Sequence, residues 1–144
     1  MLQEPEIGKL KWRDWLLLIE TTFWLLLSRL VIMILPFRWV MWTCGIQHTQ
    51  SPEAIPNEKK PIVEHISWAI DAVRWAAPLD SNCLARSIVG KRLLHRRGLS
   101  STLYLGVSKS DPQTLIAHAW LRCGNIYVTG EREHEEFTIV ATFA

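Results

Sequence analysis

The sequence predicts an α+β fold in which helices are followed by an antiparallel sheet, with an apolar helical module at the amino-terminal end. Helical periodicities extend to residue 97, and short β-rich runs separated by turn residues make up the rest. This order is typical of helices packed on one sheet. A chain of 144 residues, 49% of them hydrophobic, is long enough to bury one core. We therefore expect an apolar module over residues 1–46, a linker over 47–61 and the main domain over 62–144.

The first helix is expected over residues 15–35, where the run WLLLIETTFWLLLSRLVIMIL is almost long and apolar enough to span a bilayer. Glu20 and Arg29 lie within this run and argue against a simple span. Three further polar positions recur every seven residues and form one narrow stripe: Asp14, Thr21 and Ser28. The rest of the circumference is apolar and needs a cover. The main domain, a second copy of the chain, a partner protein and a membrane surface are all candidates for this cover.

The end of the apolar module is marked by Pro36, which breaks the helix, and by Gly45, which is a suitable final stop. The polar, proline-containing stretch QHTQSPEAIPNEKKP follows and predicts the linker. Because a flexible linker separates the module from the remainder, we expect the module to be a docking element without catalytic groups. The rival expectation is that its helix packs directly on the helix predicted over residues 62–77.

The main domain is expected to contain two helices and four strands. The helices cover residues 62–77 and 83–97, with Pro78 after the first and Gly98 as the cap of the second. The strands are the runs TLYLGV, LIAHAWLR, IYVTG and FTIVATF, separated by the turn-like segments KSDPQ, CGN and REHEE. Consecutive strands with short connections predict antiparallel pairing.

Composition excludes several classes of function. A net charge of +2 without interleaved aromatic residues does not fit nucleic-acid binding. The three cysteines have unrelated spacings and form no C-x-x-C pair of a structural zinc site. The start MLQEPEIGKLKWRDW contains acidic residues and no cleavage site before the apolar run, so a secretory signal is not expected. We expect a cytoplasmic protein, either free or peripheral to the membrane.

Two residues form a candidate catalytic pair. Cys83 follows the loop PLDSN and occupies the expected first turn of a helix, where backbone amides and the helix dipole favour a thiolate. His118 shares a strand face with Trp120, and the small Ala119 on the reverse face favours close packing on a helix. Taken alone, a single cysteine or a histidine in an apolar strand is more often structural. If the packed helix is the one that starts at Cys83, imidazole and thiol come within hydrogen-bond reach, which activates the cysteine as a nucleophile.

These motifs, in their order and spacing, resemble the transglutaminase-like cysteine peptidases of lasso peptide biosynthesis. The segments that carry the resemblance are CLARS at 83–87, RRGL at 96–99, LYLGV at 103–107 and HAWLR at 118–122. It covers roughly residues 62–143. The apolar start that ends in Pro-Phe-Arg at 36–38 is also similar to the start of that family.

The resemblance implies a papain-like fold and a hydrolase that removes the leader from a ribosomally synthesised precursor in antibiotic biosynthesis. Cys83 would be the nucleophile, and His118 the general base and then the general acid, without metal or organic cofactor. The implied partners are the precursor, a separate small leader-binding protein and a macrolactam synthetase. The apolar helix could add membrane contact or a second copy. The alternatives are amide exchange or deamidation on the same fold, and a non-catalytic membrane-associated scaffold.

The third catalytic position departs from the family pattern, because the family usually has an aspartate on the strand after the histidine and this chain has none after Asp111. A hairpin turn at Gly124 and Asn125 would place Glu131 opposite His118, whereas a turn one residue earlier would place Thr129 there. Glu131 could orient the imidazole as an aspartate does. A dyad of cysteine and histidine is the remaining alternative.

Overall fold

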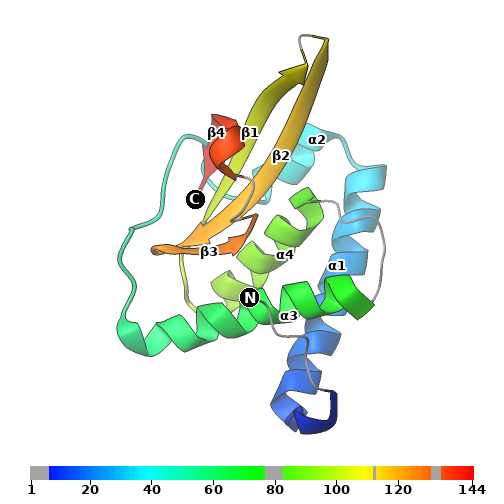
Figure 1. The fold of residues 1–144 in the computed structure, drawn as a ribbon, viewed down its shortest axis with the longest axis vertical. Coiled ribbons are helices and arrows are strands. Elements are labelled where there is room, and N and C mark those ends of the chain that lie inside the picture. The colour runs from blue at the N-terminus through cyan, green and yellow to red at the C-terminus, as the bar shows by residue number, and fades with distance from the viewer. Residues whose placement is uncertain (1–6, 77–82, 112, 131–133) are drawn as a thin grey trace.

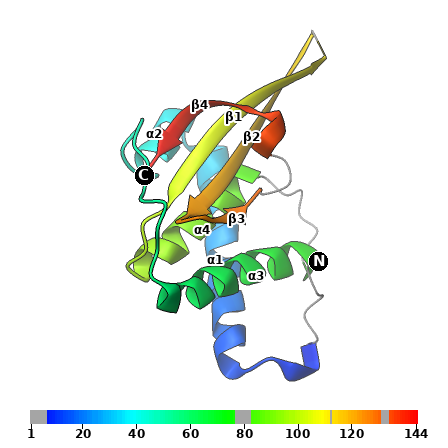
Figure 2. The ribbon, with the colours of Figure 1, turned by 60° about the vertical axis from the view of Figure 1, so that its left-hand side comes forward.

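The predicted α+β arrangement is confirmed by the computed structural model, in which helices precede a four-stranded antiparallel sheet (Figure 1). The structure describes residues 7–76, 83–111, 113–130 and 134–144. The elements are η1 (Ile7–Lys9), α1 (Trp12–Ile34), α2 (Phe37–Trp42), η2 (Asn57–Lys59), α3 (Lys60–Ala76), α4 (Cys83–Arg96), β1 (Thr102–Asp111), β2 (Thr114–Cys123), β3 (Ile126–Thr129), η3 (His134–Glu136) and β4 (Thr138–Phe143). The helices α1, α3 and α4 lie to one side of the sheet in both views (Figures 1 and 2).

Helix α1 is turned with its polar stripe toward the protein. Asp14 accepts a hydrogen bond of 2.8 Å from His65 on α3, while Thr21 and Ser28 are buried. Glu20 pairs with Arg96 at 2.8 Å and Arg97 at 2.9 Å, at the other end of the helical layer. The opposite side carries large apolar residues that are exposed, among them Trp15, Ile19, Phe23, Leu26, Leu30 and Met33. The main domain therefore covers the polar stripe of α1, and the described residues leave its widest apolar side exposed.

The segment between α2 and α3 follows the sheet and is held to it by hydrogen bonds. The N–H of Ile46 donates to the carbonyl of Ala144 at 2.8 Å, and the N–H of His48 donates to Thr142 at 2.7 Å. The hydroxyls of Ser51 and Thr102 lie 2.8 Å apart and are buried. These bonds tie the segment predicted as a linker to β1 and β4.

Helix α4 packs between α1 and the sheet. Its apolar residues Val89, Leu93 and Leu94 are fully buried in one core that also contains residues of α1, α3 and all four strands. Gly90 lets the helix approach β2, because a Cβ on Gly90 would lie 2.7 Å from Leu121 Cδ2. The helix ends as predicted at Gly98, whose φ of +71° and the bond from Leu99 N–H to the Leu94 carbonyl at 3.0 Å are typical of a glycine cap.

The sheet has the strand order β3-β2-β1-β4, and each pair is antiparallel. The hairpin of β1 and β2 extends further than expected, because Asp111 pairs with Thr114 where the sequence predicted a turn over residues 109–113. On β2, Ala119 and Leu121 belong to the core beneath the helices. Trp120 points to the opposite face, where its ring stacks on Tyr104 with the centroids 5.6 Å apart. The predicted division of β2 into a helix-packed face and a histidine-bearing face is thus present.

Candidate active site

Cys83 is the first residue of α4 and is half-buried, in contact with the core. The other two cysteines of the chain are 2% and 0% exposed, at Cys44 and Cys123. Burial raises the pKa of the Cys44 thiol to about 11 and also raises the pKa of the Cys123 thiol. The thiol at the helix start is therefore the only one of the three that a substrate can approach without unpacking the core.

His118 lies on β2 opposite Gly106 of β1 and is 7% exposed. Its ring centroid lies 5.0 Å from that of Phe137 and 6.0 Å from that of Trp120. The planes of the two β2 rings differ by 23°, so the imidazole is stacked along the indole. These rings hold the imidazole in one orientation by packing, which a general base requires.

Two glycines make room for this group of rings. A Cβ on Gly106 would lie 2.7 Å from the Trp120 ring and 2.9 Å from Phe137 Cβ. A Cβ on Gly130 would lie 2.7 Å from Trp120 Cβ and 3.1 Å from His118 Nε2. Gly130 also has a φ of +73°, a conformation that side chains other than glycine rarely adopt. A side chain at position 130 would therefore crowd both the indole and the imidazole nitrogen.

The helix that bears Cys83 contacts the end of β3 at Ser87, one turn further along α4. Ser87 is fully buried, and its hydroxyl lies 2.8 Å from that of Thr129 at the end of β3. Thr129 immediately precedes Gly130, which contacts His118. Both figures draw the start of α4 near the end of β3 (Figures 1 and 2). The end of β3 therefore connects the start of α4 with the imidazole.

Cys83 and His118 nonetheless lie on different sides of the sheet. Ala119 packs toward α4, whereas His118 shares the opposite face with Trp120. The hydrogen bonds among the described residues link α4 to β3 through Ser87 and do not link Cys83 to His118. The predicted contact between the Cys83 thiol and the His118 imidazole therefore stays a prediction.

The two alternatives for the third position differ in the turn between β2 and β3. Cys123 pairs with Ile126, so the turn is at Gly124 and Asn125. A bulge then shifts the register, and Thr129 pairs with Leu121, on the face toward α4. Glu131, the residue preferred from the sequence, lies outside the described residues. Its role stays a prediction, and the Thr129 hydroxyl is engaged with Ser87.

Four residues of this region received no role from the sequence: Ser87, Gly106, Gly130 and Phe137. Ser87 and Gly106 lie inside the segments that carry the resemblance, which was the available signal. Gly130 could have been noticed as a glycine directly after a β-rich run. Phe137 contacts the imidazole only through the pairing of β4 with β1, which no local pattern reveals. Within the described part of the chain, no three His, Cys, Asp or Glu side chains gather as metal ligands.

A helix that starts with a cysteine, followed by an antiparallel sheet with a histidine on its second strand, is the arrangement of papain-like cysteine enzymes, which form an acyl intermediate on the thiol. Comparison with known families agrees with this class. Residues 31–142 match the transglutaminase-like superfamily, and the chain belongs to it. Its members are generally cysteine enzymes, either peptidases or acyl transferases. No curated protein and no solved structure matches the chain.

Proposed function

We propose that the protein is a cysteine peptidase that removes the leader from a lasso peptide precursor, with Cys83 as nucleophile. The observation that carries the proposal is the position of Cys83, half-buried at the start of a helix while the other two cysteines are buried. The motif segments CLARS and HAWLR support the narrower assignment to leader removal, because they resemble the leader peptidases of that pathway.

The reaction uses the thiolate and the imidazole in turn. The Cys83 sulfur attacks the carbonyl carbon of the scissile amide, and backbone amides at the start of α4 bind the oxyanion that forms. The C–N bond then breaks, the leaving amine takes a proton from His118, and a thioester remains on Cys83. Water, deprotonated by His118, attacks the thioester, so that the leader leaves as a carboxylic acid and the thiol is restored.

The proposal divides leader binding and cleavage between two proteins, as in the family that the motif segments resemble. A small leader-binding protein would present the precursor, and a macrolactam synthetase would close the ring of the freed core peptide. The exposed side of α1 is available for such a partner, for a second copy or for a membrane surface.

The test is reconstitution of the full-length protein with a precursor peptide and its leader-binding protein, followed by mass spectrometry. Wild type is expected to release the leader with a new carboxyl terminus, and Cys83→Ala is expected to release none. Cys123→Ala is the matched control, because this thiol is remote from the start of α4, and it should retain cleavage. Cleavage by Cys83→Ala would overturn the proposal.

The same experiment separates peptidase from transferase. If an amine such as glycinamide is added in excess and the product carries that amine instead of a carboxylate, the protein performs amide exchange. If a glutamine side chain in the precursor gains the mass change of deamidation while the backbone stays intact, the reaction is deamidation. Either result would keep Cys83 as nucleophile and replace leader removal as the function.

A further inference from the structure

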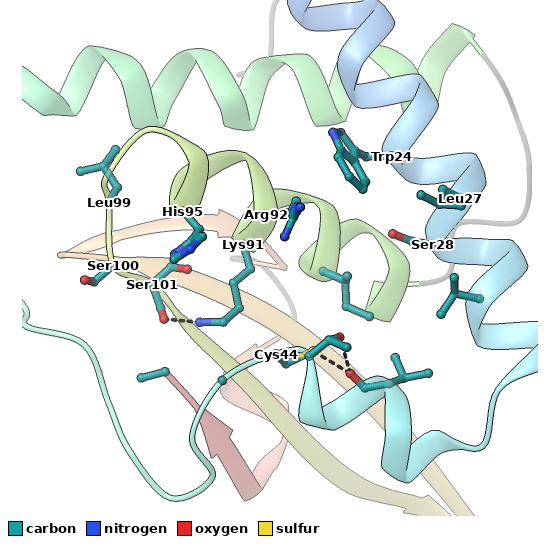
Figure 3. A pocket seen from close by; sticks show the side chains of 16 residues that line it. Trp24, Leu27, Ser28, Cys44, Lys91, Arg92, His95, Leu99, Ser100 and Ser101 are labelled. Atoms are coloured by element: carbon teal, nitrogen blue, oxygen red, sulfur yellow. Dashed lines mark hydrogen bonds between the residues drawn. The ribbon is translucent and has the colours of Figure 1, made fainter.

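A partly open cavity of about 620 Å³ lies beside the second half of α4, lined by residues of α1, α2 and α4, by residues 99–101 and by Ala144 (Figure 3). Its volume is within the range of about 300–1,000 Å³ that small-molecule sites occupy. The apolar part of the lining includes Trp24, Leu27, Val31, Val40, Ile88 and Leu99. Cys83 is not among the lining residues, and the first residue of α4 in the lining, Ile88, lies five residues or about 7.5 Å further along the helix axis, so the cavity is distinct from the candidate active site.

Three basic side chains from one side of α4 line this apolar cavity: Lys91, Arg92 and His95. The Lys91 ammonium donates to the Ser101 carbonyl at 2.7 Å and lies 3.4 Å from the Phe143 carbonyl. An ammonium has three donors, so a third remains for a ligand. Arg92 is an exposed residue, and its guanidinium lies 4.9 Å from the centre of the Trp24 ring.

The lining side chains carry positive charge, and Ala144, the last residue of the chain, adds its terminal carboxylate to the lining. None of the sixteen lining residues is aspartate or glutamate. Glu20 of α1 is not a lining residue of the cavity, and its carboxylate forms ion pairs with Arg96 and Arg97. Burial lowers the pKa of Lys91, because removal from water disfavours the charged ammonium. An anion in the cavity would remove this penalty.

The apolar wall of the cavity continues into the exposed side of α1. Leu27 lines the cavity and is also 37% exposed, and its neighbours Phe23, Leu26 and Leu30 are exposed to a greater degree. Phe37 and Trp39 of the neighbouring α2 are exposed as well. An apolar chain that follows α1 can therefore enter the cavity without crossing a polar rim on that side.

We propose that this cavity binds an amphiphile with an apolar chain and an anionic head, the chain along α1 and the head at Lys91 and Arg92. The anionic head comes either from a free fatty acid or from an anionic membrane lipid, and the chemistry of recognition is the same. The lining offers a contact for each part of the ligand: its apolar wall for the chain, and Lys91 and Arg92 for the head.

The test is calorimetric titration of the full-length protein with dodecanoate, below the concentration at which it forms micelles. Dodecanol, which has the chain without the charge, and butyrate, which has the charge without the chain, are the matched ligands. Dodecanoate should bind, and both comparison ligands should bind at least about tenfold more weakly, as expected for loss of one charge-assisted contact or of most apolar burial. Equal binding of dodecanol would overturn the proposal.

The protein variants are Arg92→Gln and Arg96→Gln, which make the same change one turn apart on α4. Arg92 lines the cavity, whereas Arg96 pairs with Glu20 outside it. Arg92→Gln should weaken dodecanoate binding about tenfold to hundredfold, and Arg96→Gln should not. Leu27→Trp, which fills the cavity from the α1 side, should abolish binding with an unchanged circular dichroism spectrum. Binding that is equal in wild type and Leu27→Trp would place the ligand elsewhere and overturn the proposal.

Flotation with phosphatidylglycerol vesicles identifies the source of the ligand. Vesicle binding that is lost in Arg92→Gln and retained in Arg96→Gln supports a membrane lipid as the ligand. Dodecanoate binding without vesicle binding supports a free fatty acid. Failure of the protein to bind either dodecanoate or vesicles overturns the proposal.

Discussion

The two ends of α4 differ in what surrounds them. The end is fixed by the Gly98 cap and by the ion pairs of Arg96 and Arg97 with Glu20, and the middle by the bonds of Lys91 to the carbonyls of Ser101 and Phe143. The start carries the half-buried Cys83, and the nearest described polar contact to the sheet is that of Ser87 one turn later. The middle and the end of α4 thus carry ion pairs and hydrogen bonds, while its first residue is a half-buried cysteine. This comparison teaches that one helix can be anchored along its length by polar contacts and still leave a partly exposed thiol at its start.

The largest expected effect concerns the imidazole near the start of α4. His118→Ala should reduce precursor cleavage about as much as loss of Cys83, on the order of a thousandfold or more, because nucleophile and base act as one unit. His48→Asn is the control, since His48 is exposed and has a φ of +61°, which asparagine tolerates. Cleavage rates from mass spectrometry compare the two variants. Equal cleavage rates in the two variants would show that His118 takes no part in the reaction.

The next effect compares the three thiols. Iodoacetamide should modify Cys83 at least about a hundredfold faster than Cys44, because at pH 8 only roughly one Cys44 thiol in a thousand is ionised. Since the pKa of Cys44 is raised to about 11, its labelling rate should increase about tenfold for each pH unit up to that value. Peptide mapping after timed labelling gives the rate at each site. Faster labelling of Cys44 or Cys123 than of Cys83 would show that the thiol at the helix start is not the most reactive of the three.

A smaller, partial effect is expected at the third position. Glu131→Gln should lower the cleavage rate about tenfold to hundredfold if this residue orients His118, and the pH profile of cleavage should shift with it. Thr129→Val should instead lower stability by about 1–2 kcal/mol, because it breaks the buried hydrogen bond with Ser87.

Ser87→Ala is the matched control for Thr129, and urea unfolding measures all three variants. If Thr129→Val reduces cleavage at unchanged stability while Glu131→Gln does not, the orienting role belongs to Thr129. If none of the three variants alters the rate, the catalytic unit is a dyad.

The smallest effect belongs to the anchored end of α4. Glu20→Gln should lower the free energy of unfolding by about 0.5–1 kcal/mol, because Arg96 is half-exposed and solvent screens the pair. The difference from wild type should shrink in high salt, and the cleavage rate should not change. Urea unfolding at two salt concentrations gives the comparison. A lowered cleavage rate at unchanged stability would show that the two ends of α4 are coupled.

Local patterns were sufficient for the element order, for the position of Cys83 at a helix start and for the two faces of β2. Helical period, capping glycine and strand alternation depend on neighbours within a few residues, so a sequence reveals them directly. The motif segments also pointed to the superfamily that residues 31–142 match. The leader-peptidase assignment goes beyond what these features establish and depends on the experiments above.

Only the tertiary structure decided which neighbour each face meets. Periodicity placed Asp14, Thr21 and Ser28 on one stripe, but the inward orientation of that stripe depends on contacts such as that of Asp14 with His65, 51 residues away. Glu20, which argued against a membrane span, contacts Arg97 across 77 residues. The approach of Gly130 to His118 depends likewise on a bulge in β3 that no local signal predicts. A sequence pattern determines which side chains share a face, whereas packing over long separations determines what covers that face.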